Sequence, residues 1–287
     1  MKGRAQAFSQ YFNSNVNRVL KVGIAVSLTF MTFTSPLKAA DRGAWADLQQ
    51  MVFKNQFISP ALNKITLTAP YRAKDDRRVP IEVNAKLSDG RTIKKLTIII
   101  DNNPMPVSAV FEMAKQRKEV SFKTHMRMNG PSPVRVIIEA NDGKLYMKQQ
   151  LVKTSGLGAC ASPPVGDPKE LLANLGDMKL KPAGLAKENV RASKLKRKAR
   201  LEIKHPNLTG LQMDQITLQY ILARFVNTVE VRHGSEKLFT LTASISLSQD
   251  PDLTFDYLFN GSNEISVKAI DTDDTKFEKS FPVGLDS

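Results

Sequence analysis

Short stretches in which apolar and polar residues alternate recur along most of this chain, and they constrain its fold more than any other feature. Alternation with a period of two places successive side chains on opposite faces of a β-strand, so that one face can be buried. Gly, Pro, Asn and Asp residues separate the stretches, as at Asn129-Gly130-Pro131 and Asn260-Gly261. The predicted strands are 65–68, 81–84, 96–100, 107–111, 120–128, 134–140 and 145–152, followed by 199–203, 223–231, 238–247, 253–259, 264–270 and 275–281. This spacing predicts an all-β fold of two immunoglobulin-like antiparallel β-sandwich domains.

Two segments of different character precede and separate the predicted sandwiches. Apolar residues recur with helical spacing over Asp41–Phe53, which predicts a short N-terminal helix. Gly and Pro recur over residues 155–198 and oppose a continuous strand or a long helix, so we expect a flexible interdomain segment with one short helix at 168–175. The expected organisation is a signal peptide, a first sandwich, an interdomain segment that bears the cysteine, and a second sandwich, at residues 1–40, 41–154, 155–198 and 199–287.

The first forty residues resemble an export signal. Lys2, Arg4, Arg18 and Lys21 precede the apolar run Val22–Phe33, which is too short to cross a bilayer comfortably. We therefore expect a cleaved Sec-type signal peptide and no stable membrane insertion. Cleavage would remove five Lys and Arg and no Asp or Glu, and the formal charge would fall from +14 to +9. The remaining positive charge suits anionic ligands or an acidic partner, and export argues against nucleic acid.

Cys160 is the only cysteine of the chain, and it lies in the interdomain segment. A lone thiol cannot form a disulfide within the chain, so it is buried, joined to another molecule, or kept free for reaction. The residues around Cys160 are small and offer little apolar surface for a core: Gly156, Gly158, Ala159, Ala161 and Ser162. They predict an exposed thiol on a flexible loop, with burial and an intermolecular disulfide as the alternatives.

Other chemistry finds little support in the sequence. A blue-copper site would require a His and a Met shortly after Cys160. Residues 161–177 contain neither. One Cys and three scattered His residues give no zinc-ligand spacing. His125, His205 and His233 are the only candidates to activate the thiol, and no spacing pairs them with Cys160. We therefore expect no metal, no cofactor and no catalytic residues.

Several segments resemble a known pair of protein families. Leu96–Phe111, with its Asp101-Asn102-Asn103-Pro104 turn, and Val152–Thr154 before the cysteine resemble SoxY, the sulfur-carrying protein of bacterial thiosulfate oxidation. Ala199–Pro206 and Ile221–Val226 resemble its partner SoxZ. The arrangement is similar to the SoxYZ-like fused carriers associated with quinoprotein dehydrogenases. In SoxY the cysteine lies in a Gly-Gly-Cys-Gly-Gly tail, whereas here a whole domain follows and the loop is tethered at both ends.

The resemblance implies a periplasmic carrier protein and not an enzyme. Cys160 would hold sulfur from thiosulfate or sulfide as a reversible adduct, and partner enzymes would process it. Periplasmic c-type cytochromes and a quinoprotein dehydrogenase are the partners that the resemblance suggests. A thiolate and an anionic adduct favour basic surroundings, for which Lys148, Lys153 and Lys169 are near in sequence.

Two other functions remain open on the sequence. The first is an accessory binding or assembly module for a quinoprotein dehydrogenase and its cytochrome, which would need no thiol chemistry. The second, weaker one is a thiol enzyme that turns over substrate by itself.

Overall fold

The computed structural model describes residues 43–54, 56–156, 158–165, 168–185 and 196–283, so the predicted signal peptide lies outside the described residues. The helices are α2 (Gly43–Phe53) and α3 (Pro168–Ala173). The strands of the first half are β1 (Ile58–Pro60), β2 (Ile65–Thr68), β3 (Val79–Lys86), β4 (Ile93–Ile100), β5 (Val107–Arg117), β6 (Glu119–Met126), β7 (Ser132–Ala140) and β8 (Leu145–Val152). Those that follow are β9 (Met178–Leu185), β10 (Lys196–Ile203), β11 (Val226–His233), β12 (Glu236–Ala243), β13 (Asp252–Leu258), β14 (Glu264–Asp271) and β15 (Lys276–Pro282).

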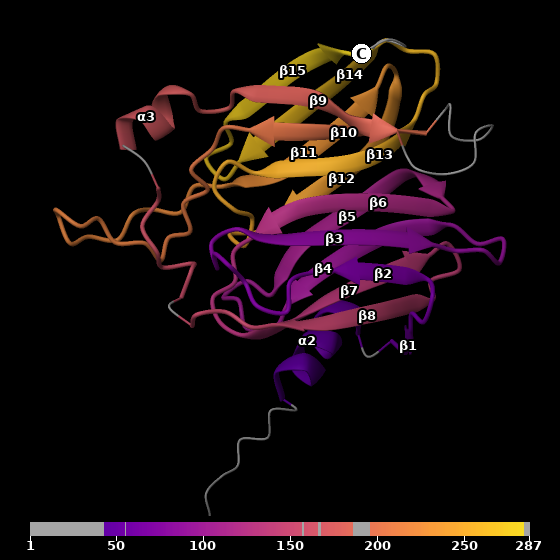
Figure 1. Cartoon of the computed structure of the whole chain (residues 1–287), viewed down its shortest axis with the longest axis horizontal. Helices are drawn as coiled ribbons and strands as arrows, with labels where there is room; N and C mark the ends of the chain where they lie inside the picture. The colour runs from indigo at the N-terminus through magenta and orange to yellow at the C-terminus, as the bar shows by residue number, and fades with distance from the viewer. Residues whose placement is uncertain (1–42, 55, 157, 166–167, 186–195, 284–287) are drawn as a thin grey trace, which may run out of the picture. The chain divides into compact units, whose positions relative to one another are not determined.

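The strands form two sheets, and each sheet runs through both halves of the chain (Figure 1). One sheet has nine strands in the order β1-β8-β7-β4-β5-β12-β11-β14-β15, and the other has six in the order β2-β3-β6-β13-β10-β9. The first half contributes one end of each sheet and the second half the other end. The two predicted sandwiches therefore lie edge to edge, joined where β5 pairs with β12 and β6 pairs with β13.

A cluster of phenylalanines fills the space between the sheets at this junction. Each of the four junction strands contributes one ring: Phe111 from β5, Phe122 from β6, Phe239 from β12 and Phe255 from β13. Phe111 stacks on Phe122 with ring centroids 4.0 Å apart, Phe122 meets Phe239 edge-on at 5.1 Å, and Phe239 meets Phe255 at 5.2 Å. All four belong to one buried hydrophobic core that includes residues of both halves. The halves are thus packed together as well as hydrogen-bonded.

The predicted all-β fold is confirmed, and every predicted strand corresponds to an observed one. The short helices predicted at 41–53 and 168–175 are also present. All strand pairs are antiparallel except the short β1–β8 pair. No helix in the described part of the chain is long and apolar enough to span a membrane.

Two strands were not predicted, β1 and β9. Each contains a proline, Pro60 in β1 and Pro182 in β9. Both lie at a sheet edge, where a missing backbone N–H breaks no ladder of hydrogen bonds. The inference that Gly and Pro exclude a strand from the interdomain segment is therefore wrong for residues 178–185.

Candidate thiol site

Cys160 lies in a tight turn between β8 and α3. Two glycines before it have backbone angles in the left-handed region, with φ of 80° at Gly156 and 73° at Gly158. Glycine adopts such angles without the steric penalty that a Cβ imposes. The amide of Ala161 donates to the carbonyl of Gly158 at 3.0 Å and closes the turn. These glycines therefore shape a particular turn, and the flexibility of this loop stays a prediction.

The prediction that Cys160 is exposed is wrong, because its exposed fraction is 0%. Among the small residues around it, Ala159 is also buried, Gly158 and Ser162 are half-buried, and only Gly156 and Ala161 are exposed. Small side chains allow this turn to pack closely against the second half of the chain. The prediction considered the local residues alone, and the covering atoms come from segments far along the chain.

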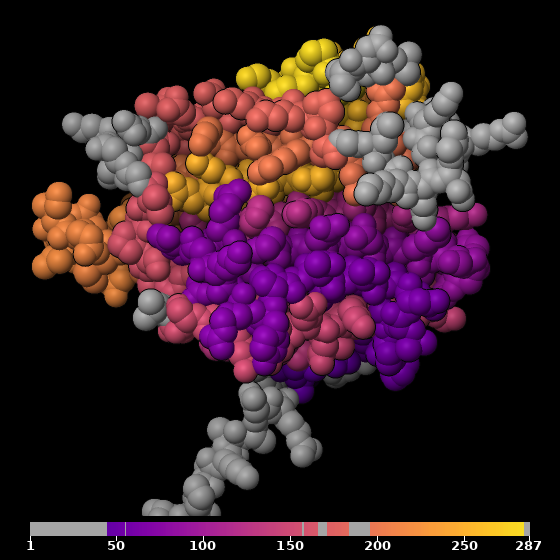
Figure 2. Space-filling view, viewed as in Figure 1, coloured from indigo at the N-terminus to yellow at the C-terminus, as the bar shows by residue number. Residues whose placement is uncertain are grey.

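Side chains of the second half hold the turn in place. The Thr209 hydroxyl donates to the carbonyl oxygen of Cys160 at 2.6 Å, and Gln212 Nε2 donates to the carbonyl of Ser162 at 2.8 Å. Thr209 and Gln212 are themselves buried, with exposed fractions of 4% and 1%. We call this pair the latch. Both residues belong to the connection between β10 and β11, and part of this connection projects from the surface (orange, left of Figures 1 and 2).

Further hydrogen bonds anchor the segment before and after the turn. Val165 exchanges two hydrogen bonds with the side chain of Gln249, at 3.0 and 2.7 Å. On the other side, the backbone amide of Ser155 donates to Asp76 Oδ2 at 2.8 Å, and its hydroxyl bonds the same oxygen. The cysteine-bearing segment is therefore fixed to both halves of the molecule.

A buried arginine provides the charge that acts on the thiol. Burial raises the pKa of the Cys160 thiol to about 11, and the positive charge of Arg127 opposes this rise. Arg127 is 3% exposed, and burial lowers the pKa of its guanidinium to about 10. Its Nη1 donates to the carbonyls of Leu247 at 2.6 Å and Ile245 at 3.3 Å, and Nη2 donates to Pro206 at 3.4 Å. At neutral pH the thiol is therefore protonated and the guanidinium charged.

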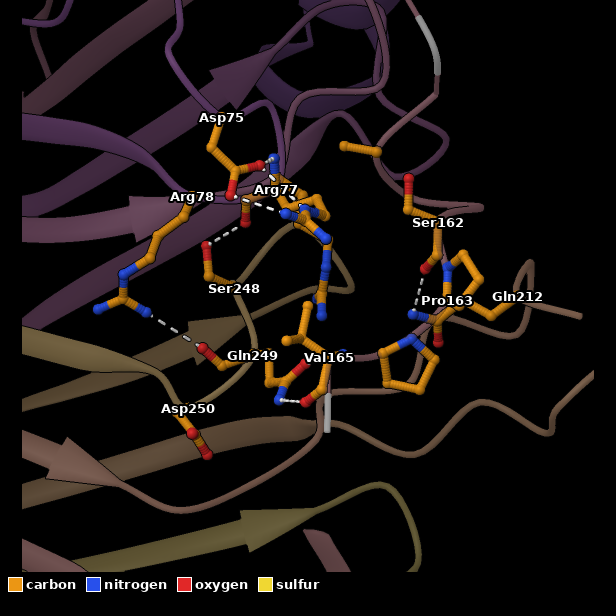
Figure 3. Close-up of a pocket in the computed structure, with 13 residues that line it drawn as sticks. Asp75, Arg77, Arg78, Ser162, Pro163, Val165, Gln212, Ser248, Gln249 and Asp250 are labelled. Atoms are coloured by element: carbon orange, nitrogen blue, oxygen red, sulfur yellow. Dashed lines mark hydrogen bonds and ion pairs between the residues drawn. The ribbon is translucent and has the colours of Figure 1, made fainter. Parts of the chain in front are cut away.

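A cavity of about 270 Å³ opens beside the turn (Figure 3). Residues on both sides of Cys160 contribute to its wall, together with arginines from the first half and polar residues of the second. Its lining residues are Asp75, Arg77, Arg78, Arg127, Ala159, Ser162, Pro163, Pro164, Val165, Gln212, Ser248, Gln249 and Asp250. The arginines were not predicted, because they are near Cys160 only in the folded chain. The only sign of these arginines in the sequence was that Arg77 and Arg78 are adjacent, which indicates a local concentration of positive charge.

The lysines expected beside the thiol do not provide its positive surroundings. Lys148 is exposed on β8, and the ammonium of Lys153 lies 5.0 Å from the centre of the Tyr71 ring. Neither lines the cavity. The side chain of Lys169 lies outside the described residues.

The three histidines have partners other than Cys160 among the described residues. His125 Nδ1 lies 2.7 Å from Asp252, His205 contacts Asp271 at 3.5 Å, and His233 Nε2 is 2.8 Å from the carbonyl of Ser262. The described residues also contain no group of His, Cys, Asp and Glu that could hold a metal ion. The site thus consists of a buried neutral thiol, a buried guanidinium and a cavity.

Two family models match the chain, one in each half. The model described as sulfur oxidation protein SoxY matches residues 49–160, and that described as sulphur oxidation protein SoxZ matches residues 187–282. No curated protein matches the chain. Among solved structures, the sulfur carrier protein SoxY from Chlorobium limicola f thiosulfatophilum is 24% identical, with a TM-score of 0.34, over 39% of this chain and 92% of that one. A superoxide reductase (neelaredoxin) from Ignicoccus hospitalis is 13% identical, with a TM-score of 0.27, over 34% of this chain and 95% of that one.

Proposed function

We propose, from the fusion of a SoxY domain with a SoxZ domain in this one chain, that the protein is a carrier that holds sulfur intermediates covalently on Cys160. The observation that carries this proposal is where the SoxY match ends. It covers residues 49–160, and its last residue is the only cysteine of the chain. The SoxZ domain then acts as a companion within the same chain, and its latch residues hold the turn that bears the thiol.

Loading with thiosulfate requires an oxidant. The thiol sulfur forms a bond to the outer sulfur of thiosulfate, the thiol proton is released, and two electrons leave. The product is a thiosulfonate, Cys160–S–S–SO₃⁻, and a c-type cytochrome is the class of partner that would accept the electrons. Because the thiolate is the nucleophile, the partner or the opening of the turn must first relieve the burial that raises the thiol pKa.

Burial also requires the turn to open before any partner can reach the sulfur. The backbone is continuous on both sides, so opening means displacement of residues 158–162 from the latch. One buried and one partly buried hydrogen bond must then break, each worth about 0.5–1.5 kcal/mol net. Movement on this scale presents the thiol at the surface as a loop tethered at both ends.

Intact-mass measurement tests the carrier function. Wild-type protein, purified without reductant after exposure of cells to thiosulfate, is expected to carry additions of sulfur or sulfonate that reductant removes. The Cys160→Ser protein is the matched control and is expected to show none. Wild-type protein with no reversible addition after this exposure would exclude the proposal.

Export to the periplasm belongs to the same proposal, with the charged and apolar N-terminal segment as its support. The protein from the periplasmic fraction is expected to lack about forty N-terminal residues, as a Sec-type signal predicts. Full-length protein confined to the cytoplasm would contradict export.

An accessory role without thiol chemistry is the second candidate, and the buried, protonated state of Cys160 favours it. Such a module would serve a quinoprotein dehydrogenase and its cytochrome through its basic surface. It predicts that Cys160→Ser leaves the growth phenotype of the wild type intact. Loss of growth on a sulfur substrate in that mutant would favour the carrier.

A further inference from the structure

Most of the charged side chains that line the cavity beside Cys160 form ion pairs. Arg77 pairs with Asp75 at 3.0 Å, and Arg78 pairs with Asp252 at 2.9 Å. Asp250, the other carboxylate of the wall, pairs with Lys204 at 2.8 Å. These lining charges therefore have partners of opposite sign.

Arg127 is the exception among the described lining residues. Only backbone carbonyls receive its hydrogen bonds, and no carboxylate of the described residues forms an ion pair with it. A buried charge that lacks a counter-charge is costly, because carbonyl dipoles replace only part of the lost hydration. Its pKa of about 10 keeps the guanidinium charged at neutral pH. The cavity wall thus holds one uncompensated positive charge.

The cavity has room for a small anion. Its volume of about 270 Å³ far exceeds the roughly 10–15 Å³ that a cavity needs to hold one water molecule. Ala159 and Ser162, on either side of Cys160, form part of the wall. Cys160 itself is buried and does not line the cavity, so a group attached to its sulfur enters this space when the turn shifts.

We infer that this cavity is an oxyanion site in which Arg127 binds the sulfonate end of the cargo. The choice of a sulfur oxyanion rests on the proposed carrier function, whereas the preference for an anion rests on the cavity itself. A thiosulfonate has a delocalised negative charge that a guanidinium binds through charge-assisted hydrogen bonds. A persulfide lacks the sulfonate oxygens that accept these hydrogen bonds. The site therefore favours oxidised cargo that ends in a sulfonate.

Binding of free anions to Cys160→Ser protein tests this inference without covalent chemistry. Calorimetric titration with thiosulfate and sulfite is expected to show saturable binding, and sulfate and phosphate are expected to bind less tightly. Arg127→Met is expected to weaken thiosulfate binding by about tenfold to a hundredfold, the effect of losing a charged hydrogen-bonding partner. Arg232→Gln on β11 removes an ion-paired arginine outside the cavity and is expected to leave the affinity unchanged.

Arg127 is buried, so Arg77→Gln at the cavity wall and Arg127→Lys provide readouts if Arg127→Met does not fold. Each is expected to weaken thiosulfate binding, and Arg127→Lys is expected to retain part of it because the charge remains. The absence of saturable binding to Cys160→Ser protein would overturn the inference, as would equal affinities in all the arginine variants. Tighter binding of phosphate or sulfate than of thiosulfate would overturn the assignment to sulfur cargo. Failure of the carrier function would instead appear as absent mass additions on the wild type, which this titration does not involve.

Discussion

Cys160 is protonated and covered, and both properties can be measured through its rate of alkylation. With a thiol pKa of about 11 in place of the ordinary 9.0, the thiolate is about a hundredfold scarcer at pH 8. We expect iodoacetamide to modify native protein at least a hundredfold more slowly than urea-unfolded protein at pH 8. The native rate should continue to rise up to about pH 11. Mass spectrometry of quenched samples gives both rates.

The same shift links the thiol to stability. Because the folded-state pKa is raised, the buried neutral thiol favours the folded state below pH 9, and this contribution is lost as the pH rises towards 11. In urea titrations, Cys160→Ala should therefore lose less stability between pH 9 and 11 than the wild type does. A native alkylation rate equal to the unfolded one would contradict the buried site.

The sequence identified Cys160 as the residue of interest but misjudged its surroundings. Small neighbours such as Ala159 indicate how closely a turn can pack, but they do not indicate which residues pack against it. The latch residues Thr209 and Gln212 and the charged residue Arg127 are about 30 to 50 positions away in the sequence. Their approach depends on strand order, which alternation within single strands does not determine.

At the scale of elements, the latch is expected to control access to the thiol. Thr209→Val keeps the shape of the side chain but removes the hydroxyl that donates to the carbonyl of Cys160. A net loss of about 1 kcal/mol corresponds to about fivefold more frequent opening. Alkylation of Cys160 in native buffer should therefore become about fivefold faster.

Thr66→Val on β2 is the matched control, since that threonine is exposed on a strand outside the thiol site. It should leave the alkylation rate at the wild-type value. If Thr209→Val also leaves the rate unchanged, opening of the turn does not involve the latch. Urea titration of both variants separates local opening from global unfolding.

The predictability of each element depended on its position in the sheets. Interior strands such as β4 and β7 have runs of consecutive buried residues that are mostly apolar, so both faces of each strand are buried there. Edge strands β1 and β9 carry proline and little apolar pattern, so periodicity does not reveal them. The pairing of β5 with β12 joins residues more than a hundred positions apart and is equally absent from local pattern.

At the scale of the whole molecule, shared sheets and a shared core should make the two halves unfold together. Phe111 is fully buried at the junction and contacts rings from both halves, Phe122 and Phe239. Phe111→Ala should cost about 3–5 kcal/mol, as expected for removal of a buried aromatic side chain. If the halves form one cooperative unit, this loss should appear equally in β7 of the first half and β14 of the second. Native-state hydrogen exchange of their slowest amides measures both values.

Leu258→Ala on β13 is the control for this experiment, because Leu258 is 54% exposed and its removal leaves no cavity in the core. It should change the free energy of exchange of the slowest amides in either strand by less than about 0.5 kcal/mol, as is usual for surface substitutions. If Phe111→Ala lowers protection in β7 alone, the halves unfold independently and the edge-to-edge pairing is too weak to couple them. Equal losses of protection in β7 and β14 would mean that both halves form one folding unit. The hydrogen bond from Thr209 to Cys160 would then persist only while both halves are folded.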